Sequence, residues 1–177
     1  MAKPIRRIVT GHNAQGKSIL AQDGIATSIL EMKAAPGLRV TDLWETTTTP
    51  ANLSGDADPV ARPVHLEPAA TGTIFRIVEL PPDSAISKGT DSREAFAALG
   101  ASHTVDTTSS TPMMHKTASV DYAIVLSGEV WAVMDEGETR MKAGDVLIQR
   151  GTNHAWSNRT NEPAMVAFIL VGAKPLS

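Results

Sequence analysis

Three residues of this sequence stand out for the chemistry that their side chains can do together: His115, Asp121 and His154. Two imidazoles and one carboxylate form an open zinc or non-haem iron site, in which water or substrate fills the remaining positions. A carboxylate in such surroundings can also act as a general base. The alternative without metal is a hydrogen-bonded pair of His115 and Asp121 inside a core.

Short strands must position these side chains. Because side chains alternate between the two faces of a strand, His115 and Thr117 share one face, and His154 and Trp156 share one face of a later strand. Asp121 opens the strand between them. In a closed barrel, such faces line one interior, so we expect the polar side chains to meet there.

The sequence pattern predicts many short strands and one short helix. The strands are expected at residues 5–10, 17–22, 38–48, 72–80, 113–117, 121–127, 129–134, 138–142, 145–149, 154–157 and 164–171. Asp23-Gly24 predicts a turn, and residues 50–70, with four prolines, predict a loop over the surface. A helix is predicted over residues 92–99, because Asp91 can cap it and Glu94 follows three residues later. Short strands without a long helix indicate an all-β sandwich or barrel.

Composition narrows the function classes. The chain has 177 residues, which fits one domain, and its lack of cysteine excludes disulfides and thiolate sites. A net charge of -3 without a long basic run argues against a nucleic-acid partner. The longest apolar run, residues 164–173, is too short to span a membrane, and no apolar segment follows the basic start. We therefore expect a cytoplasmic protein without a membrane partner.

Residues Gly11 to Ser18 match the phosphate-loop pattern G-x4-G-K-[ST]. That motif also needs a helix beginning at its Lys-Ser end, since the phosphates bind to helix N-terminal N–H groups. Only four residues separate Ser18 from the turn signal Asp23-Gly24, which is too short for such a helix. We interpret this segment as the turn of a β-hairpin.

Two segments resemble the paired motifs of the cupin superfamily, G-x5-H-x-H-x3,4-E-x6-G and G-x5-P-x-G-x2-H-x3-N. The matching residues are His115, Asp121 (at the Glu position), Gly128, Gly144, Gly151, His154 and Asn158. Thr117 stands at the second His position and Gln149 where proline is usual. The chain is similar to small single-domain cupins of the conserved-barrel type 2, a subfamily mostly without assigned function.

This resemblance implies a fold and a site. The fold would be a double-stranded β-helix barrel over residues 72–171, with N-terminal strands and a wrapping loop over residues 1–71, all in one domain. One divalent metal (zinc, iron, manganese or nickel) would be bound by His115, Asp121 and His154. Two copies would form a homodimer, because small cupins commonly pair through sheet edges and N-terminal strands.

Further residues are expected around this centre. Asp121, Thr117, Arg76 and Gln149 are the candidate catalytic residues, and Arg76, if it faces inward, could bind a substrate carboxylate or carbonyl. The predicted substrate pocket contains Met113, Val125, Trp156 and Phe168, an apolar set that suits a small organic molecule. His12, His65 and His103 are expected at the surface.

The expected function is a metal-dependent enzyme acting on a small oxygen-bearing substrate, whose carbonyl or hydroxyl the metal at His115, Asp121 and His154 would polarise. A lyase or dehydratase, or an isomerase, is favoured, because the site has polar donors but an incomplete ligand set for redox chemistry. A non-haem iron dioxygenase is one alternative, since two histidines and a carboxylate also form that kind of site. A non-catalytic ligand-binding cupin is another, because the second histidine of the first motif is replaced by Thr117.

Overall fold

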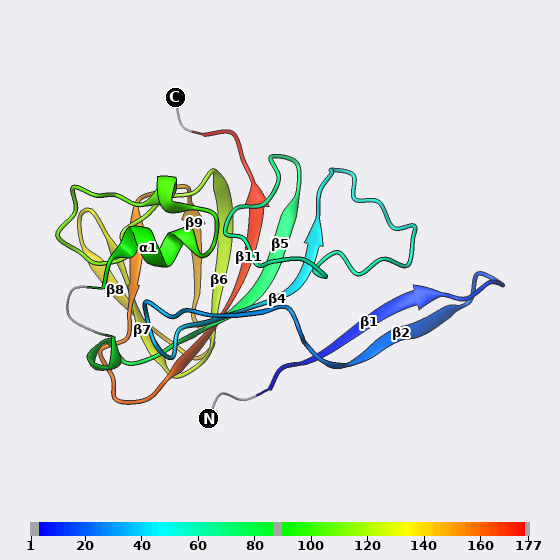
Figure 1. Ribbon diagram of the computed structural model, residues 1–177, viewed down its shortest axis with the longest axis horizontal. Helices are drawn as coiled ribbons and strands as arrows, with labels where there is room; N and C mark the ends of the chain where they lie inside the picture. Colours follow the sequence, from blue (N-terminus) through cyan, green and yellow to red (C-terminus); the bar gives the residue numbers. More distant parts are fainter. Residues whose placement is uncertain (1–3, 87–89, 176–177) are drawn as a thin grey trace.

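Antiparallel strands are the main regular elements of this protein, whose computed structural model describes residues 4–86 and 90–175 (Figure 1). The strands are β1 (Arg6–His12), β2 (Ser18–Ile25), β3 (Ile29–Glu31), β4 (Arg39–Thr46), β5 (Thr73–Leu80), β6 (Ser119–Ser127), β7 (Glu129–Met134), β8 (Glu138–Lys142), β9 (Val146–Arg150), β10 (His154–Ser157) and β11 (Ala164–Gly172). Between β5 and β6, the described residues form the α-helix α1 (Ser92–Ala97) and the 3-10 turns η1 (Asp83–Ala85) and η2 (Ser102–Thr104).

Two sheets form the barrel. The larger has the strand order β3-β4-β5-β11-β6-β9, and the smaller has the order β10-β7-β8. Small and branched apolar side chains from β6, β7 and β11, among them Val125, Val130 and Val166, are packed between the sheets. This confirms the expected all-β cupin barrel. Since β3 and β4 belong to the larger sheet, the barrel wall begins ahead of residue 72.

The hairpin of β1 and β2 stands away from the barrel (Figure 1). The segment that imitates a phosphate loop is its turn, because His12 pairs with Ser18 and the Asn13 side chain accepts hydrogen bonds from the backbone of Gln15 and Lys17. Gly16 has a φ of +72°, which the turn requires and glycine adopts freely. The hairpin interpretation is confirmed.

Three local predictions need correction. The turn at Asp23-Gly24 is wrong, because β2 runs through both residues to Ile25 and pairs with β1. The strand over residues 113–117 is wrong: Met113 has a φ of 63°, which ends extended backbone, and only His115 makes isolated bridges, to Val105 and His154. The sequence pattern also missed the three-residue strand β3.

The predicted helix is α1, shorter than expected. Its N-cap is Asp91, whose side chain accepts from the backbone N–H groups of Arg93 and Glu94. Phe96, which is buried, packs with Leu38 and Val40 from the β4 region. The helix therefore anchors the segment that leads from β5 to His115 against the barrel. No helix among the described residues is long and apolar enough to cross a membrane.

Gly128 explains why the first motif ends in glycine. It lies between β6 and β7 with a φ of +74°, a conformation that L side chains rarely adopt. A Cβ atom at this position would lie 2.8 Å from the Cα atom of Ala164. The glycine therefore lets β11 approach the turn closely.

Candidate functional site

A cavity of about 120 Å³ lies inside the barrel. Its wall is mostly apolar, with residues from β4, β5, β11 and α1 such as Val40, Leu80, Phe96 and Leu170. Five polar side chains share this wall: Arg76, His115, Thr117, Asp121 and His154. An apolar cavity of about 150 Å³ is known to hold benzene, so the space suits a molecule of about one small ring.

His115 and His154 face one another across an isolated β-bridge. Their backbones exchange two N–H···O hydrogen bonds of 2.9 Å, and their ring centroids lie 4.3 Å apart. His115 Nδ1 lies 2.9 Å from the Met113 carbonyl oxygen, and His154 Nδ1 lies 3.0 Å from that of Thr152. A carbonyl only accepts hydrogen bonds, so Nδ1 carries the proton in both rings. Each Nε2 is then the basic nitrogen.

Both imidazoles are neutral at physiological pH. Burial, and to a smaller extent the neighbouring His154, lower the pKa of His115 to about 3. Burial likewise lowers the pKa of His154. The cost of placing an ion in a mostly apolar wall is the physical cause in both cases.

Met113 has a structural role that the sequence did not indicate. It is the only non-glycine residue with a positive φ, 63°, among those that the structure describes. Its N–H donates to the Ser92 hydroxyl at the start of α1, and its carbonyl oxygen meets His115 Nδ1. Helix α1 therefore holds a strained turn that orients an imidazole, and such strain is typical of functional sites.

Asp121 lies on the inner face of β6, at the end of a chain of hydroxyl groups. Thr117 Oγ1 lies 2.8 Å from Ser119 Oγ, and the Ser119 hydroxyl donates to Asp121 Oδ1 at 2.6 Å. Burial raises the pKa of Asp121 to about 6, although the Ser119 hydrogen bond and the charge of Arg76 oppose the shift. The carboxyl group can therefore both take up and release a proton near neutral pH.

The three predicted metal ligands do not come together as a ligand set. Within residues 4–86 and 90–175, no group of three His, Cys, Asp or Glu side chains is arranged to hold a metal ion. His115 and His154 are adjacent, whereas the carboxyl group of Asp121 is turned to Ser119 on its own strand. The donors present are thus two imidazole nitrogens, one fewer than an open three-ligand site needs.

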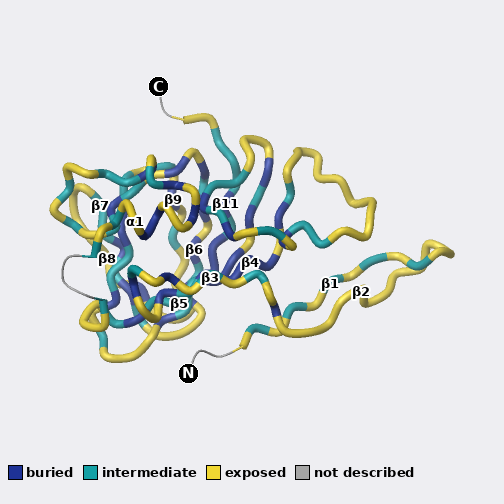
Figure 2. The backbone as a smooth tube through the Cα atoms, viewed as in Figure 1, coloured by how far each residue is buried: buried dark blue, intermediate teal, exposed yellow. Residues whose placement is uncertain are grey.

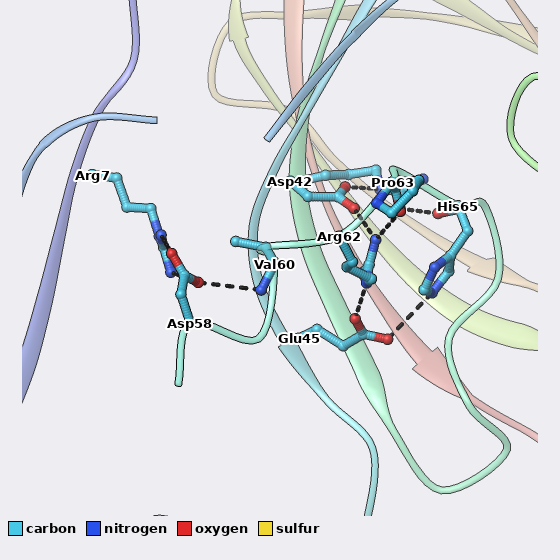
Figure 3. A network of polar contacts seen from close by, with 9 residues as sticks. Arg7, Asp42, Glu45, Asp58, Val60, Arg62, Pro63 and His65 are labelled. Carbon is cyan, nitrogen blue, oxygen red and sulfur yellow. Dashed lines mark hydrogen bonds and ion pairs between the residues drawn. The ribbon is translucent and has the colours of Figure 1, made fainter. Parts of the chain in front are cut away.

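A buried polar network lies behind the cavity wall (Figure 3). Arg76 on β5 faces inward, 2% exposed, and its Nε lies 3.0 Å from Oδ1 of Asp42, its direct partner on β4. Arg62, from the loop over residues 50–70, contacts Asp42 and also Glu45. His65 Nε2 lies 3.2 Å from Glu45 Oε1, which continues the network toward the surface.

The remaining predicted residues fall into two groups. Met113, Thr117, Trp156 and Phe168 line the cavity, and the Trp156 and Phe168 rings meet edge to face at 5.2 Å. Gln149 is buried but turned to the loop, where its amide donates to the backbone carbonyl of Thr152. Val125 is packed in the core between the sheets. Gln149 and Val125 thus support the barrel rather than the cavity.

The other three histidines differ in setting. His12 in the hairpin is exposed, and His103 is exposed beside Glu67, as predicted for surface residues. His65 was also predicted at the surface, yet its imidazole is only 38% exposed and contacts the buried Glu45.

Sequence reasoning missed the acids and the arginine behind the cavity. Asp42 and Glu45 lie within β4, a strand that was predicted from its β-branched residues alone. Two acidic residues inside such a strand could have indicated a buried arginine nearby, since a buried carboxylate needs a cationic partner. The sequence did not indicate the position of the Arg62 side chain, because its loop has no periodicity from which an inward direction could be inferred.

Comparisons with known proteins agree with this geometry. Residues 103–171 match the family described as the cupin domain. The chain is 32% identical over 176 residues to phomopsin biosynthesis cluster protein C' of Diaporthe leptostromiformis, covering 96% of this chain and 79% of that protein. It is 28% identical over 179 residues to the cupin-domain-containing oxidoreductase virC of Hypocrea virens, covering 96% and 77%. The chain belongs to the cupin family.

The reaction class in the names of these relatives differs from the one expected from the sequence. Where a name gives a reaction class, as for the Hypocrea virens protein, it is an oxidoreductase rather than a lyase or dehydratase. A further relative, oryzines biosynthesis cluster protein J of Aspergillus oryzae, is 45% identical over 67 residues, 37% of each chain.

Proposed function

We propose that this protein is an enzyme that moves a proton on a small oxygen-bearing organic molecule, as an isomerase or as a lyase of the dehydratase type. The observation that carries the proposal is the convergence of Asp121, His115, His154 and Arg76 on one small apolar cavity. Apolar walls with a few convergent polar groups are typical of small-molecule sites. The biosynthetic relatives support a small-molecule substrate.

Asp121 is the proposed base. Its carboxylate would take a proton from the carbon next to a substrate carbonyl, and the electron pair of that C–H bond would move to the carbonyl oxygen as an enolate. Returning the proton to another carbon gives an isomer. If a hydroxyl group lies on the next carbon, Asp121 would return its proton to that hydroxyl, which leaves as water while the electron pair of the enolate forms the new C=C bond.

The two imidazoles fit the binding of the substrate hydroxyl. Each is neutral with Nδ1 hydrogen bonded to a backbone carbonyl, so each Nε2 can accept a hydrogen bond from a substrate hydroxyl. The apolar wall excludes water from the enolate. None of these steps uses a metal ion.

The test is solvent deuterium incorporation into small cyclic ketones, and water loss from cyclic β-hydroxy ketones, followed by NMR. Asp121→Asn should lose about 100-fold or more of the rate with either probe class, as is usual for removal of a general base. Asp56→Asn, in an exposed loop, is the matched control and should keep the full rate. Full activity of Asp121→Asn would exclude the proposed base.

A second candidate function is an oxidoreductase. The observation that favours it is the similarity to virC over nearly the whole chain. Oxygen consumption in the presence of small phenols, or reduction of an added electron acceptor, distinguishes it from proton transfer, which consumes neither. The divalent metal expected from the resemblance stays a prediction, and elemental analysis of the purified protein tests it.

Pairing of two copies also stays a prediction. The hairpin offers support, since Ile8, Ile19, Leu20 and Ile25 are exposed on strands that stand away from the barrel (Figure 2). Light scattering should give about twice the mass of one chain, and a mass of one chain would contradict pairing.

A further inference from the structure

Arg76 is a buried cation at the wall of the cavity. It lies on the inner face of β5, directly across from Asp42 on β4 and Phe168 on β11. Its side chain is among the least exposed charged groups of the described chain, and it lines the cavity beside the apolar side chains. An arginine stays charged in proteins, so this position holds a permanent positive charge against an apolar space.

Acidic neighbours, namely Asp42, Glu45 and Asp121, act on the charge of Arg76, but its hydrogen bonds are incomplete. Its Nη2 donates to the backbone carbonyl of His65, and its Nε lies 3.0 Å from Asp42 Oδ1 without forming an aligned hydrogen bond. Oδ2 of Asp42 accepts from Arg62 Nη1 at 3.1 Å, so Arg76 shares this carboxylate with a second guanidinium, whose other partner is Glu45. Nε of Arg76 is thus a buried nitrogen without a hydrogen-bond partner among the residues that the structure describes.

The same neighbours fix the guanidinium in place. Arg62 bridges the carboxylates of Asp42 and Glu45, and its Nη1 also donates to the Pro63 carbonyl (Figure 3). Glu45 in turn contacts His65, whose carbonyl oxygen accepts from Arg76. The loop over residues 50–70 and strand β4 thus hold Arg76 from the side away from the cavity.

We propose that Arg76 is a binding site for the oxygen anion of a small organic acid, whose apolar part occupies the cavity. A carboxylate or an enolate oxygen would accept an aligned hydrogen bond from this guanidinium, which Asp42 does not accept. The proposal rests on the proposed function in the same cavity and adds the substrate class: one ring-sized apolar group that carries a carboxylate or an enolisable carbonyl.

The cavity limits the ligand in two further ways. Its volume of about 120 Å³ admits one small ring. The rings of Phe96, His115, His154, Trp156 and Phe168 follow one another at centroid distances of 4.3 to 6.0 Å. Such an aromatic wall accepts a flat apolar group. It has few polar groups that could replace the hydration water of a larger or strongly hydrated anion, such as a sugar phosphate.

The experiment compares two probes of similar size, benzoate and the neutral benzyl alcohol, by isothermal titration calorimetry on the full chain. Benzoate should bind the wild-type protein about tenfold or more tightly than benzyl alcohol, as expected for a charge-assisted hydrogen bond. Arg76→Lys keeps the charge but loses the planar pair of donors, and should lose most of this preference while its affinity for benzyl alcohol stays unchanged. Arg140→Lys, an exposed arginine on β8, is the matched control and should behave as wild type.

The outcomes separate this inference from the proposed function. Equal affinity for the two probes, or no binding of either, overturns anion binding at Arg76 and leaves the Asp121→Asn activity test unaffected. If Arg76→Lys does not fold, the Arg76 Nε–Hε resonance of the wild-type protein gives the answer. It should shift on addition of benzoate and stay in place on addition of benzyl alcohol, and an unmoved resonance with benzoate bound overturns the assignment.

Discussion

Two arginine–aspartate pairs cross neighbouring strands in this protein. In the hairpin, Arg6 donates to both carboxylate oxygens of Asp23, at 2.7 and 2.6 Å, and both side chains are largely in solvent. In the barrel, Arg76 and Asp42 are almost completely buried, yet the closest atoms lie 3.0 Å apart and are not aligned for a hydrogen bond. The pair with the better geometry is thus the one at the surface.

The exposed pair has well-aligned hydrogen bonds, whereas the buried pair leaves polar atoms without a hydrogen-bond partner. In water, Arg6 and Asp23 lose little if their contact breaks, because solvent screens both charges. Inside the barrel, each unpaired polar atom costs free energy, and native proteins rarely leave such atoms without a reason. The incomplete pair lies at the cavity wall, which is where a ligand would complete it.

The largest expected effect comes from removing one member of the buried pair. Asp42→Ala leaves Arg76 and Arg62 without their shared carboxylate, so the free energy of unfolding should fall by about 3–5 kcal/mol. Urea unfolding followed by circular dichroism measures it. A loss as small as that of an exposed carboxylate would mean that burial makes no difference between the two pairs.

Asp121 approaches Arg76 from the cavity side and gives the next effect, which depends on pH. Its pKa is raised from 3.8 to about 6, so the folded state binds more protons between these values and stability falls as pH rises through that window. Asp121→Asn removes this loss. The variant should match wild type near pH 4 and gain up to about 3 kcal/mol above pH 6.

The quantity to compare is the difference in free energy of unfolding between Asp121→Asn and wild type at each pH, rather than the pH dependence of either protein alone. The lowered pKa of His115, about 3, makes both proteins lose stability as pH falls below 6.5, because the unfolded chain binds that proton first. This contribution cancels in the difference. Urea unfolding at a series of pH values measures it, and a difference that does not change with pH contradicts the raised pKa.

A smaller effect is expected when the buried pair is replaced as a whole. Asp42→Leu combined with Arg76→Met removes both charges together, so the double variant should lie within about 1.5 kcal/mol of wild type and well above Asp42→Ala. A double variant as unstable as the single one would mean that Arg62, rather than Arg76, depends on the carboxylate.

The smallest effect is expected in the hairpin. Asp23→Ala breaks the exposed pair with Arg6, and the midpoint of urea unfolding should stay where it is in wild type. Adding salt should leave this result unchanged, because the charges are already screened. A clear shift of the midpoint would show that the pair of Arg6 and Asp23 contributes to the stability of the protein.

The barrel was predictable because its signals are local. Alternating apolar residues and turn residues marked most strands, and the motif positions around His115 and His154 fixed which strands must face one another. The errors arose where a long-range contact decides the local conformation. Asp23-Gly24 resembles a turn, but pairing with β1 keeps it extended, and the Ser92 hydroxyl helps to hold the left-handed Met113.

The site was predictable only in part. His115, Asp121 and His154 line the same cavity, as the motif positions predicted, but such positions cannot tell which way a carboxyl group turns, and Asp121 turns to Ser119. Arg62 reaches Asp42 across 20 residues of chain, from a loop whose course no sequence pattern defines. Gln149, at a motif position, donates a hydrogen bond to a loop carbonyl and does not line the cavity.

The edge-to-face contact between Trp156 and Phe168 gives the protein an optical signal of its own. Trp156 lines the cavity, whereas Trp44 and Trp131, the other tryptophans of the chain, lie under the guanidinium groups of Arg7 and Arg159. A molecule that enters the cavity therefore changes the surroundings of one indole in three. The tryptophan emission spectrum can follow occupancy in real time, without a label or a known reaction.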